Sequence, residues 1–240
     1  MQFQNTLEYA RELDSQDKIA SYRDQFIFPQ HDGKNVIYFT GNSLGLQPKS
    51  AKKYVDEIMT DWANLAVEGH FYAEKPWWDY HERFSEKLAK VVGAKPAEVT
   101  VMNTLTVNLH LLMVSFYRPE GKRYKIICEE KAFPSDQYMI SSQVRFHGYD
   151  PKDAIVEIRR REGENNFRTE DIIAKINEVG EECALVLIGG VNYYTGQVLE
   201  MEKITKAGHE IGAFVGWDLA HAAGNIELKL SEWEVDFAAW

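Results

Sequence analysis

The sequence is poor in cysteine and in basic residues, and it contains no long apolar run. Its two cysteines, Cys128 and Cys183, lie in apolar stretches of a 240-residue chain, so we expect buried thiols rather than a disulfide framework. Lys and Arg number 27 against 37 Asp and Glu, a net charge of −10, which argues against nucleic acid because phosphate contacts need a basic face. No stretch has the length of a membrane span, and the first ten residues do not form a signal peptide. These absences predict a cytoplasmic protein.

Common nucleotide, hydrolase and metal motifs are also missing. No G-x-G-x-x-G follows a predicted strand and no G-x-x-x-x-G-K-[ST] is present, so neither a dinucleotide fold nor a nucleoside-triphosphate loop is supported. The G-x-S-x-G elbow of many hydrolases does not occur. His209 and Glu210 lack the second histidine of a zinc helix, and the 7 histidines are scattered. We therefore expect no metal site.

From about residue 98 onward, apolar runs alternate with amphipathic stretches. Strands are expected at residues 98–102, 124–128, 154–158, 183–188, 213–217 and 235–240. Helices are expected at about residues 106–118, 134–143, 170–179 and 201–211. This alternation is typical of an α/β fold with a mostly parallel central sheet flanked by helices. The sequence stops inside the last expected strand, which favours a truncated chain.

The first part of the chain lacks this alternation. Residues 1–66 are predicted to form an N-terminal arm with a short strand at 36–40 and a helix opened by Pro48, and residues 67–240 to form a larger domain. The apolar residues of that helix follow three-and-four spacing, which predicts packing into a core. They are Ala51, Tyr54, Val55, Ile58, Met59, Trp62 and Leu65.

A linker dense in aromatic rings follows this helix at residues 68–78 and includes His70. Its glycine and proline are expected to interrupt regular structure. Loops of this kind often line binding sites. A second helix is predicted at about residues 78–92, with Gly93 ending it.

A carboxylate at the end of a predicted buried strand is the most informative single feature. Asp218 follows the apolar residues 213–217, at the edge where open parallel sheets bind ligands. His221 follows three positions later among small residues that leave room for a flat ring. A buried carboxylate needs a cationic partner, and a protonated heterocyclic nitrogen would serve. The alternative is an aspartate that caps the next helix, with a surface histidine beside it.

Three other junctions on the same sheet edge carry groups that suit a planar phosphorylated ligand. Thr104 and Thr106 begin a helix whose free N–H groups could bind phosphate, although threonine there can also be a simple cap. Phe133 offers a ring face for stacking, and Asp136 lies in the first turn of the helix, where compensation of the helix dipole alone is the alternative reading. Residues 189–196 supply glycines and tyrosines. Phosphate, ring face and protonated nitrogen together match pyridoxal 5'-phosphate.

Several segments in this order also resemble one family. They are G-N-S-L-G-L-Q-P from Gly41, M-N-T-L-T-V-N-L-H, K-A-F-P-S-D, Y-T-G-Q, and G-W-D-L-A-H-A-A-G-N followed by W-E-V-D-F-A-A-W. From Gly41 onward the chain is similar to the kynureninase family, within the aspartate-aminotransferase-like group of pyridoxal-phosphate enzymes. The resemblance implies the large domain of that fold.

The resemblance also implies roles for individual residues. Asp218 pairs with the pyridinium nitrogen and is the catalytic residue, while Leu105 and Thr106 meet the phosphate and Phe133 stacks on the ring. Ser43 and His70 match positions associated with the substrate. The implied cofactor contacts are Leu105, Thr106, Phe133, Pro134, Ser135, Asp136, Asp218 and His221.

The chemistry implied is hydrolysis of L-kynurenine, and of its 3-hydroxy form, to anthranilate or 3-hydroxyanthranilate and L-alanine, within tryptophan catabolism and NAD biosynthesis. A homodimer with small-molecule substrates is implied, without nucleic acid or membrane partners. Family members carry their Schiff-base lysine and a C-terminal small domain beyond the strand that ends at Trp240, and Lys229 is too early to replace that lysine. As given, the chain is therefore expected to be an inactive fragment.

Two alternatives remain open. One is a related pyridoxal-phosphate lyase such as a cysteine desulfurase, against which the aromatic linker around His70 favours an aryl substrate. The other is a non-catalytic binding subunit, which the missing lysine permits. One position departs from the family pattern, since Gly189 stands where relatives can carry a hydroxyl residue.

Overall fold

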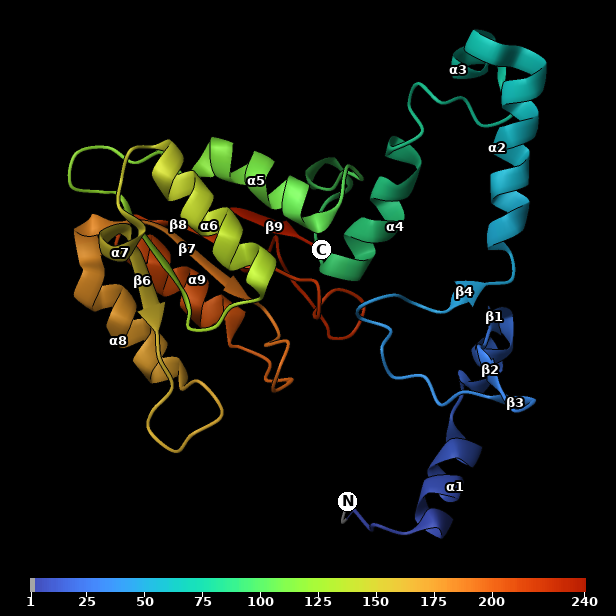
Figure 1. Cartoon of the computed structure of the whole chain (residues 1–240), viewed down its shortest axis with the longest axis horizontal. Coiled ribbons are helices and arrows are strands. Elements are labelled where there is room, and N and C mark those ends of the chain that lie inside the picture. The colour runs from blue at the N-terminus through green and yellow to red at the C-terminus, as the bar shows by residue number, and fades with distance from the viewer. Residues whose placement is uncertain (1–2) are drawn as a thin grey trace. The chain divides into compact units, whose positions relative to one another are not determined.

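The computed structural model describes residues 3–240, which separate into two compact units. The first ends at Trp78 and the second runs from Asp79 to Trp240, inside the range 67–240 that the sequence predicts for the larger domain. Each unit is described by itself (Figure 1). No helix within residues 3–240 is both long enough and apolar enough to cross a lipid bilayer.

The second unit is built on one parallel sheet of five strands. In spatial order these are β6 (Ile155–Ile158), β5 (Lys125–Glu129), β7 (Cys183–Gly189), β8 (Phe214–Asp218) and β9 (Phe237–Ala239). Every pair is parallel, so the carboxyl ends of all the strands meet at one edge. In the register of the central strands, Gly189 pairs with Asp218, and Asp218 pairs with Ala239.

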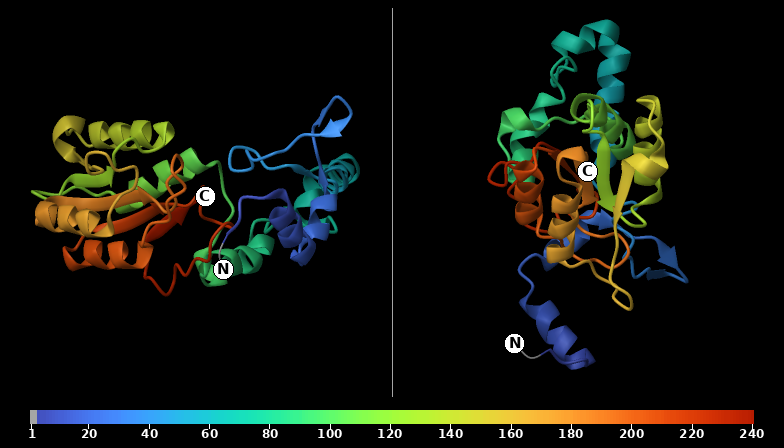
Figure 2. Two further views of the ribbon diagram at one scale, coloured as in Figure 1. Left: turned by 90° about the horizontal axis from the view of Figure 1, so that it is seen from below. Right: turned by 90° about the vertical axis from the view of Figure 1, so that its left-hand side faces the viewer.

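Helices cover both faces of this sheet, as the layers in Figure 2 show. One face packs against α5 (Leu105–Phe116) and α6 (Pro134–Phe146) through Leu109, Met113 and Met139. The other face packs against α4 (Glu82–Val92), α8 (Thr169–Val179) and α9 (Met201–Glu210). The α/β class and the mostly parallel sheet predicted from the sequence are therefore confirmed.

Apolar side chains that are buried on both faces explain why the central strands form here. Trp217 on β8 is fully buried, and its indole Nε1 donates a hydrogen bond to Thr205 Oγ1 on α9 at 3.1 Å. Cys128 and Cys183 are also buried and unbonded to each other, as expected, and burial raises the pKa of each thiol to about 12. Both thiols are therefore neutral packing groups.

The strand predicted at residues 98–102 is wrong. A 3-10 turn (Pro96–Glu98) occupies its start, and extended chain without a ladder partner follows among the described residues. The apolar composition of this segment reflects burial of Val99 beside α4, where the Ser85 hydroxyl donates to the Val99 carbonyl at 2.8 Å. A side chain therefore satisfies a backbone group that a neighbouring strand would otherwise satisfy. Gly93 ends α4 in the left-handed conformation, φ 64°, as predicted.

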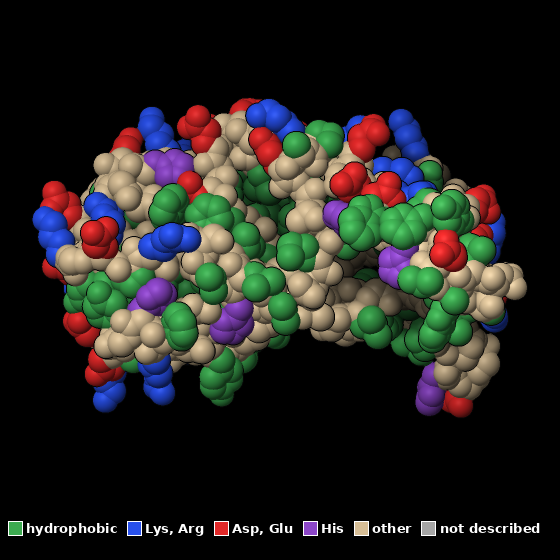
Figure 3. All heavy atoms as spheres, turned by 90° about the horizontal axis from the view of Figure 1, so that it is seen from above, with side chains coloured by type: hydrophobic (Ala, Val, Ile, Leu, Met, Phe, Trp, Pro, Cys, Tyr) green, Lys and Arg blue, Asp and Glu red, His purple; other side chains and the backbone are tan. Residues whose placement is uncertain are grey.

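The remaining elements of the second unit are short. They are α7 (Pro151–Ala154), which leads directly into β6, and the 3-10 helix η4 (Gly180–Glu182), which precedes β7. On the face shown in Figure 3, acidic and basic side chains are interspersed rather than separated by sign.

The first unit contains helices and two small antiparallel ribbons. Its helices are α1 (Leu7–Gln16), η1 (Ala20–Gln25), α2 (Ala51–Leu65), η2 (Ala66–Glu68) and α3 (Gly69–Tyr72). The ribbons pair β1 (Phe26–Ile27) with β4 (Gln47–Pro48), and β2 (Gln30–His31) with β3 (Lys34–Asn35). The predicted strand at 36–40 is wrong because the ribbon ends before it, and Pro48 pairs in β4 instead of opening a helix.

The apolar stripe of α2 does not pack into a core within the described chain. Trp62 is 62% exposed and Val55 60% exposed, so the predicted core packing of this helix is wrong for the unit as it stands. The spacing was correct and the helix forms, but no described element of the first unit covers the stripe. The short helix α3 also lies inside the linker that was expected to be irregular, and the second predicted helix begins at Glu82 rather than near residue 78.

Candidate functional site

Three carboxyl groups converge at the carboxyl edge of the sheet. Glu129 ends β5, Asp136 lies in the first turn of α6, and Asp218 ends β8. Their residues are 5%, 6% and 9% exposed, respectively. Within residues 3–240, no three His, Cys, Asp or Glu side chains are arranged to hold a metal ion. The structure therefore presents buried acids without a metal-type geometry.

Asp136 and Asp218 are hydrogen-bonded to each other through their side chains. Burial, followed by the negative charge of Asp218, raises the pKa of Asp136 well above its usual range, so this carboxyl keeps its proton and donates. The Ser135 hydroxyl donates to Asp136 Oδ1 at 3.3 Å, and the Ala220 backbone N–H donates to Asp218 Oδ1 at 2.8 Å. The fold thus brings together two acids that sequence reasoning placed at separate junctions.

Glu129 is a site residue that the sequence reasoning missed. Burial raises its pKa to about 7, the Asn192 side chain lowers it by a hydrogen bond, and the charge of Asp218 raises it further. Its Oε2 atom is buried with no hydrogen-bond partner among the described residues. The sequence did contain a pattern that indicates Glu129 as a site residue. Glu129 follows the apolar run K-I-I-C, just as Asp218 follows the apolar run of its own strand.

Gly189 makes room for this convergence. It lies on β7, between the strands that carry Glu129 and Asp218, and a Cβ atom there would stand 3.3 Å from Glu129 Oε1. That separation is tighter than ordinary van der Waals contact. The space that a side chain at position 189 would enter is therefore bordered by the carboxyl group of Glu129.

The ring of Phe133 lies at the start of α6, beside the acid pair. Phe133 is the N-cap residue and Pro134 the first helical residue, as the sequence predicted. The Phe133 ring is 45% exposed and meets the Tyr193 ring edge-on, with centroids 5.2 Å apart. One aromatic face at this junction therefore remains accessible to a planar ligand.

The first turn of α5 lies at the same sheet edge. Thr104 is its N-cap, and within the described chain its side chain makes no capping hydrogen bond. Asn108 instead ties the turn, accepting from the Asn103 N–H and donating to the Asn103 carbonyl, each at 3.1 Å. Asn103 and Asn108 line one hollow together with Ala239, which pairs with Asp218 in the sheet. Leu105 and Thr106, the predicted phosphate contacts, are half-buried in this turn.

His221 lies half-buried in the turn that follows β8. Residues 220–225 form this turn, and no helix starts there within the described residues, so the reading of Asp218 as a helix cap is wrong. Asp218 instead accepts the N–H two residues later, which holds the turn close to the strand end.

Ser43 and His70 belong to the first unit. Ser43 is exposed in a turn closed by its N–H to the Thr40 carbonyl at 3.0 Å. The His70 ring is also exposed; its Nδ1 lies 2.9 Å from the Val67 carbonyl oxygen, and it meets the Trp77 ring edge-on at 5.3 Å. Their association with a substrate stays a prediction.

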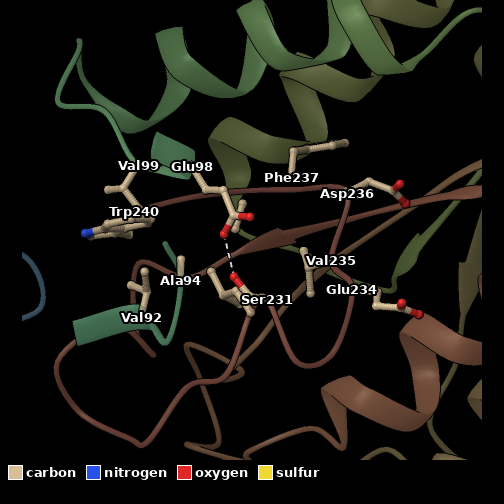
Figure 4. A pocket seen from close by; sticks show the side chains of 12 residues that line it. Val92, Ala94, Glu98, Val99, Ser231, Glu234, Val235, Asp236, Phe237 and Trp240 are labelled. Atoms are coloured by element: carbon tan, nitrogen blue, oxygen red, sulfur yellow. Dashed lines mark hydrogen bonds between the residues drawn. The ribbon is translucent and has the colours of Figure 1, made fainter. Parts of the chain in front are cut away.

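A separate hollow lies beside β9 and contains none of the predicted site residues among its described lining. Glu98, Asp236, Phe237 and Trp240 border it, and the Ser231 hydroxyl donates to Glu98 (Figure 4). This hydrogen bond is the main reason that the pKa of Glu98 falls to about 2. The Glu98 carboxylate in this hollow therefore has a hydrogen-bond donor, unlike Glu129 Oε2 at the end of β5.

Comparison with known proteins defines the family. The aminotransferase class-V model matches residues 37–240. The chain belongs to the aminotransferase class-V family. A class-V relative named kynureninase from Christiangramia forsetii is 84% identical over 100% of this chain and 56% of its own length. A kynureninase from Flavobacterium psychrophilum is 76% identical with the same coverage. The resemblance to kynureninases is confirmed, and the chain spans about half the length of these relatives.

A solved structure shares the fold of this chain at lower identity. The apo cysteine desulfurase from Thermococcus onnurineus superposes with a TM-score of 0.62 at 18% identity, covering 99% of this chain and 53% of that one. At this identity the likeness concerns the fold alone. It supports the predicted transferase-like α/β architecture.

Proposed function

We propose that this chain is the part of a kynureninase that binds pyridoxal 5'-phosphate, and that the whole protein hydrolyses L-kynurenine and 3-hydroxykynurenine to anthranilate or 3-hydroxyanthranilate and L-alanine. The observation that carries the proposal is the buried, hydrogen-bonded pair of Asp136 and Asp218 at the carboxyl edge of the parallel sheet. The names of relatives that are 84% and 76% identical support the substrate class.

The residues present fit the proposed cofactor. Two adjoining buried acids and the unpartnered Glu129 Oε2 atom favour a positive charge, which a protonated ring nitrogen supplies. The accessible face of Phe133 suits an aromatic ring, and the first turn of α5, with Leu105 and Thr106, suits a phosphate. Pro134 and Ser135 would also contact the cofactor, and His221 would contact it from the turn that follows β8.

When bound, pyridoxal phosphate would supply an electron sink for the substrate carbon whose bonds are rearranged. The task of Asp218 is to keep the ring nitrogen protonated, because an adjacent negative charge favours the charged form. Asp136 holds Asp218 in place through their hydrogen bond, and the Ala220 N–H fixes one of the Asp218 oxygens. Because both acids are buried, they would keep water away from a ring nitrogen bound beside them.

We also propose the finer assignments that the comparisons leave open. These are Ser43 and His70 as substrate contacts, residues 67–240 as the cofactor-binding domain, a cytoplasmic homodimer, and a place in tryptophan catabolism and NAD biosynthesis. The contact between the exposed His70 ring and the half-buried Trp77 ring supports an aryl substrate, because it offers ring edges beside an imidazole.

A substrate panel tests the proposal. The full-length protein should release anthranilate from kynurenine, with a visible absorption band after addition of pyridoxal phosphate. Sulfide release from cysteine, without turnover of kynurenine, would favour the cysteine desulfurase alternative that shares this fold. Cofactor binding without turnover of either compound would favour a non-catalytic binding subunit.

A further inference from the structure

Glu129 has no role in the contacts proposed so far. It is 5% exposed, its Oε1 atom faces the space over Gly189, and its Oε2 atom has no partner within the described residues. An ionised carboxylate in that position would be costly, whereas a protonated one is tolerated. The side chain is therefore a buried acid that points into a site lined by two more acids.

The groups around Glu129 come from four elements. Asp218 on β8 and Asp136 on α6 contribute negative charge to the cluster, and Asn192 after β7 donates a hydrogen bond to Glu129. Arg160 after β6 attracts Glu129 at a distance, but its Nε and backbone N–H both donate to Glu130, at 3.0 and 2.9 Å. Cys128, the neighbouring strand residue, stays neutral.

We propose that Glu129 is a positioning residue that holds a proton until a ligand with a cationic ring nitrogen pairs with Asp218, and releases that proton to solvent as the ligand binds. The inference rests on the proposed function and adds a proton stoichiometry to it. The O–H bond of the Glu129 carboxyl breaks, its electron pair stays on the carboxylate, and the proton goes to buffer. The ligand cation then offsets the new negative charge.

The consequence is a cofactor affinity that depends on pH. Below about pH 7, a ligand that binds must expel the Glu129 proton, so binding weakens as the solution becomes more acidic. Between pH 6 and 7, Glu129 releases about 0.7 proton for each ligand bound. The affinity of the protein for the cofactor should therefore rise about fivefold as the pH rises from 6 to 7. A glutamine at this position has no proton to lose.

The chain contains a matched control one residue away. Glu130 is also an acid, one residue beyond the end of β5, but it accepts hydrogen bonds from Arg160 and its pKa is lowered, chiefly by the Arg160 N–H. A Glu130→Gln change therefore removes a carboxylate without removing a bound proton. Comparing E129Q with E130Q separates the proposed role from a general effect of charge.

The experiment is calorimetric titration of the full-length protein with pyridoxal phosphate at pH 6.5, in buffers of different ionisation enthalpy. Wild type and E130Q should release the same number of protons, and E129Q about 0.7 proton fewer. The 1-deaza analogue of the cofactor has CH in place of the ring nitrogen. With this analogue, wild type and E129Q should release the same number of protons. Equal release by all three proteins would overturn the inference while leaving the proposed function intact. Failure of wild type to bind pyridoxal phosphate would overturn both.

A second measurement needs no variant and applies if E129Q does not fold. Infrared difference spectra of wild-type protein, with and without pyridoxal phosphate, should lose the C=O band of a protonated carboxyl. Carboxyl-¹³C labelling of glutamate alone should shift that band, because Glu129 is the proposed source. A band that does not respond to glutamate labelling assigns the proton to an aspartate and refutes the role of Glu129.

Discussion

Acids on the surface around α8 differ from the acids at the carboxyl edge of the sheet. On the surface, Arg161 clamps Asp171 with two hydrogen bonds of 2.7 Å, and Arg168 holds Glu164 with bonds of 2.6 and 2.9 Å. The pKa values of Asp171 and Glu164 are lowered, chiefly by these hydrogen bonds. At the sheet edge, burial raises the pKa of Glu129 to about 7.

The direction of the pKa shift distinguishes the solvated acids of the surface from the buried acids of the candidate site. A surface pair is solvated and screened, so it adds little to stability. Buried acids without a cation destabilise the fold unless they hold protons, and clusters of this kind occur where binding or catalysis needs them. Four predictions test the contrast, beginning with the largest expected effect.

Asp218→Ala should abolish most turnover in the full-length protein. Removing the charge that keeps a ring nitrogen protonated should lower kcat by about 10²- to 10³-fold, the usual effect of deleting one electrostatic stabiliser. Some cofactor should remain bound because the Phe133 and α5 contacts persist. Steady-state hydrolysis of kynurenine measures the effect, and unchanged activity would contradict the assignment of Asp218.

Glu129→Gln should change how stability depends on pH. The folded chain keeps the Glu129 proton up to about pH 7, whereas the unfolded chain loses it near the ordinary glutamate pKa of 4.5. This group therefore lowers the free energy of unfolding as the pH rises from about 4.5 to about 7. Without ligand, wild type should lose on the order of 3 kcal/mol more than the variant across this range. Urea unfolding at several pH values measures the difference, and parallel curves would refute it.

Gly189→Ser should have a moderate effect. The new Cβ lies 3.3 Å from Glu129 Oε1, so the carboxyl must shift slightly, at about 1 kcal/mol. The added hydroxyl could donate to Glu129 and favour its ionised form, which would lower its pKa. Denaturant midpoints give the stability change, and the proton count in the calorimetric experiment should fall. An unaltered proton count would show that the hydroxyl does not reach Glu129.

Asp171→Asn should have the smallest effect. Its partner Arg161 is solvated, so loss of this pair should leave the urea midpoint and the pH profile nearly unchanged. High salt should reduce even that difference, because screening weakens exposed pairs. If Asp171→Asn changed the pH dependence of stability as much as Glu129→Gln is expected to, the distinction between surface acids and acids of the sheet edge would be refuted.

Much of the second unit could be predicted from local pattern. The strands β5 to β9 and the helices α5, α6, α8 and α9 were placed within a few residues because buried parallel strands are apolar runs and surface helices are periodic. The strand expected at 98–102 does not form: Val99 is buried beside α4 without a ladder partner, and Val101 and Met102 are 42% and 58% exposed. The predicted core packing of α2 was wrong for another reason. Periodicity shows which face of a helix is apolar, but not whether another element covers that face.

The sequence alone determined which segments become strands and that Asp218 ends one of them, because these features depend on neighbours a few residues away. It also contained the family pattern. Only the tertiary structure decided that Glu129, 89 positions earlier by number, shares a site with Asp218. The strand order β5-β7-β8 and the missing side chain of Gly189 bring them together. Two adjacent glutamates therefore differ in charge state, because Glu129 ends β5 with its carboxyl group buried over Gly189, whereas Glu130, one residue beyond the strand, accepts hydrogen bonds from Arg160.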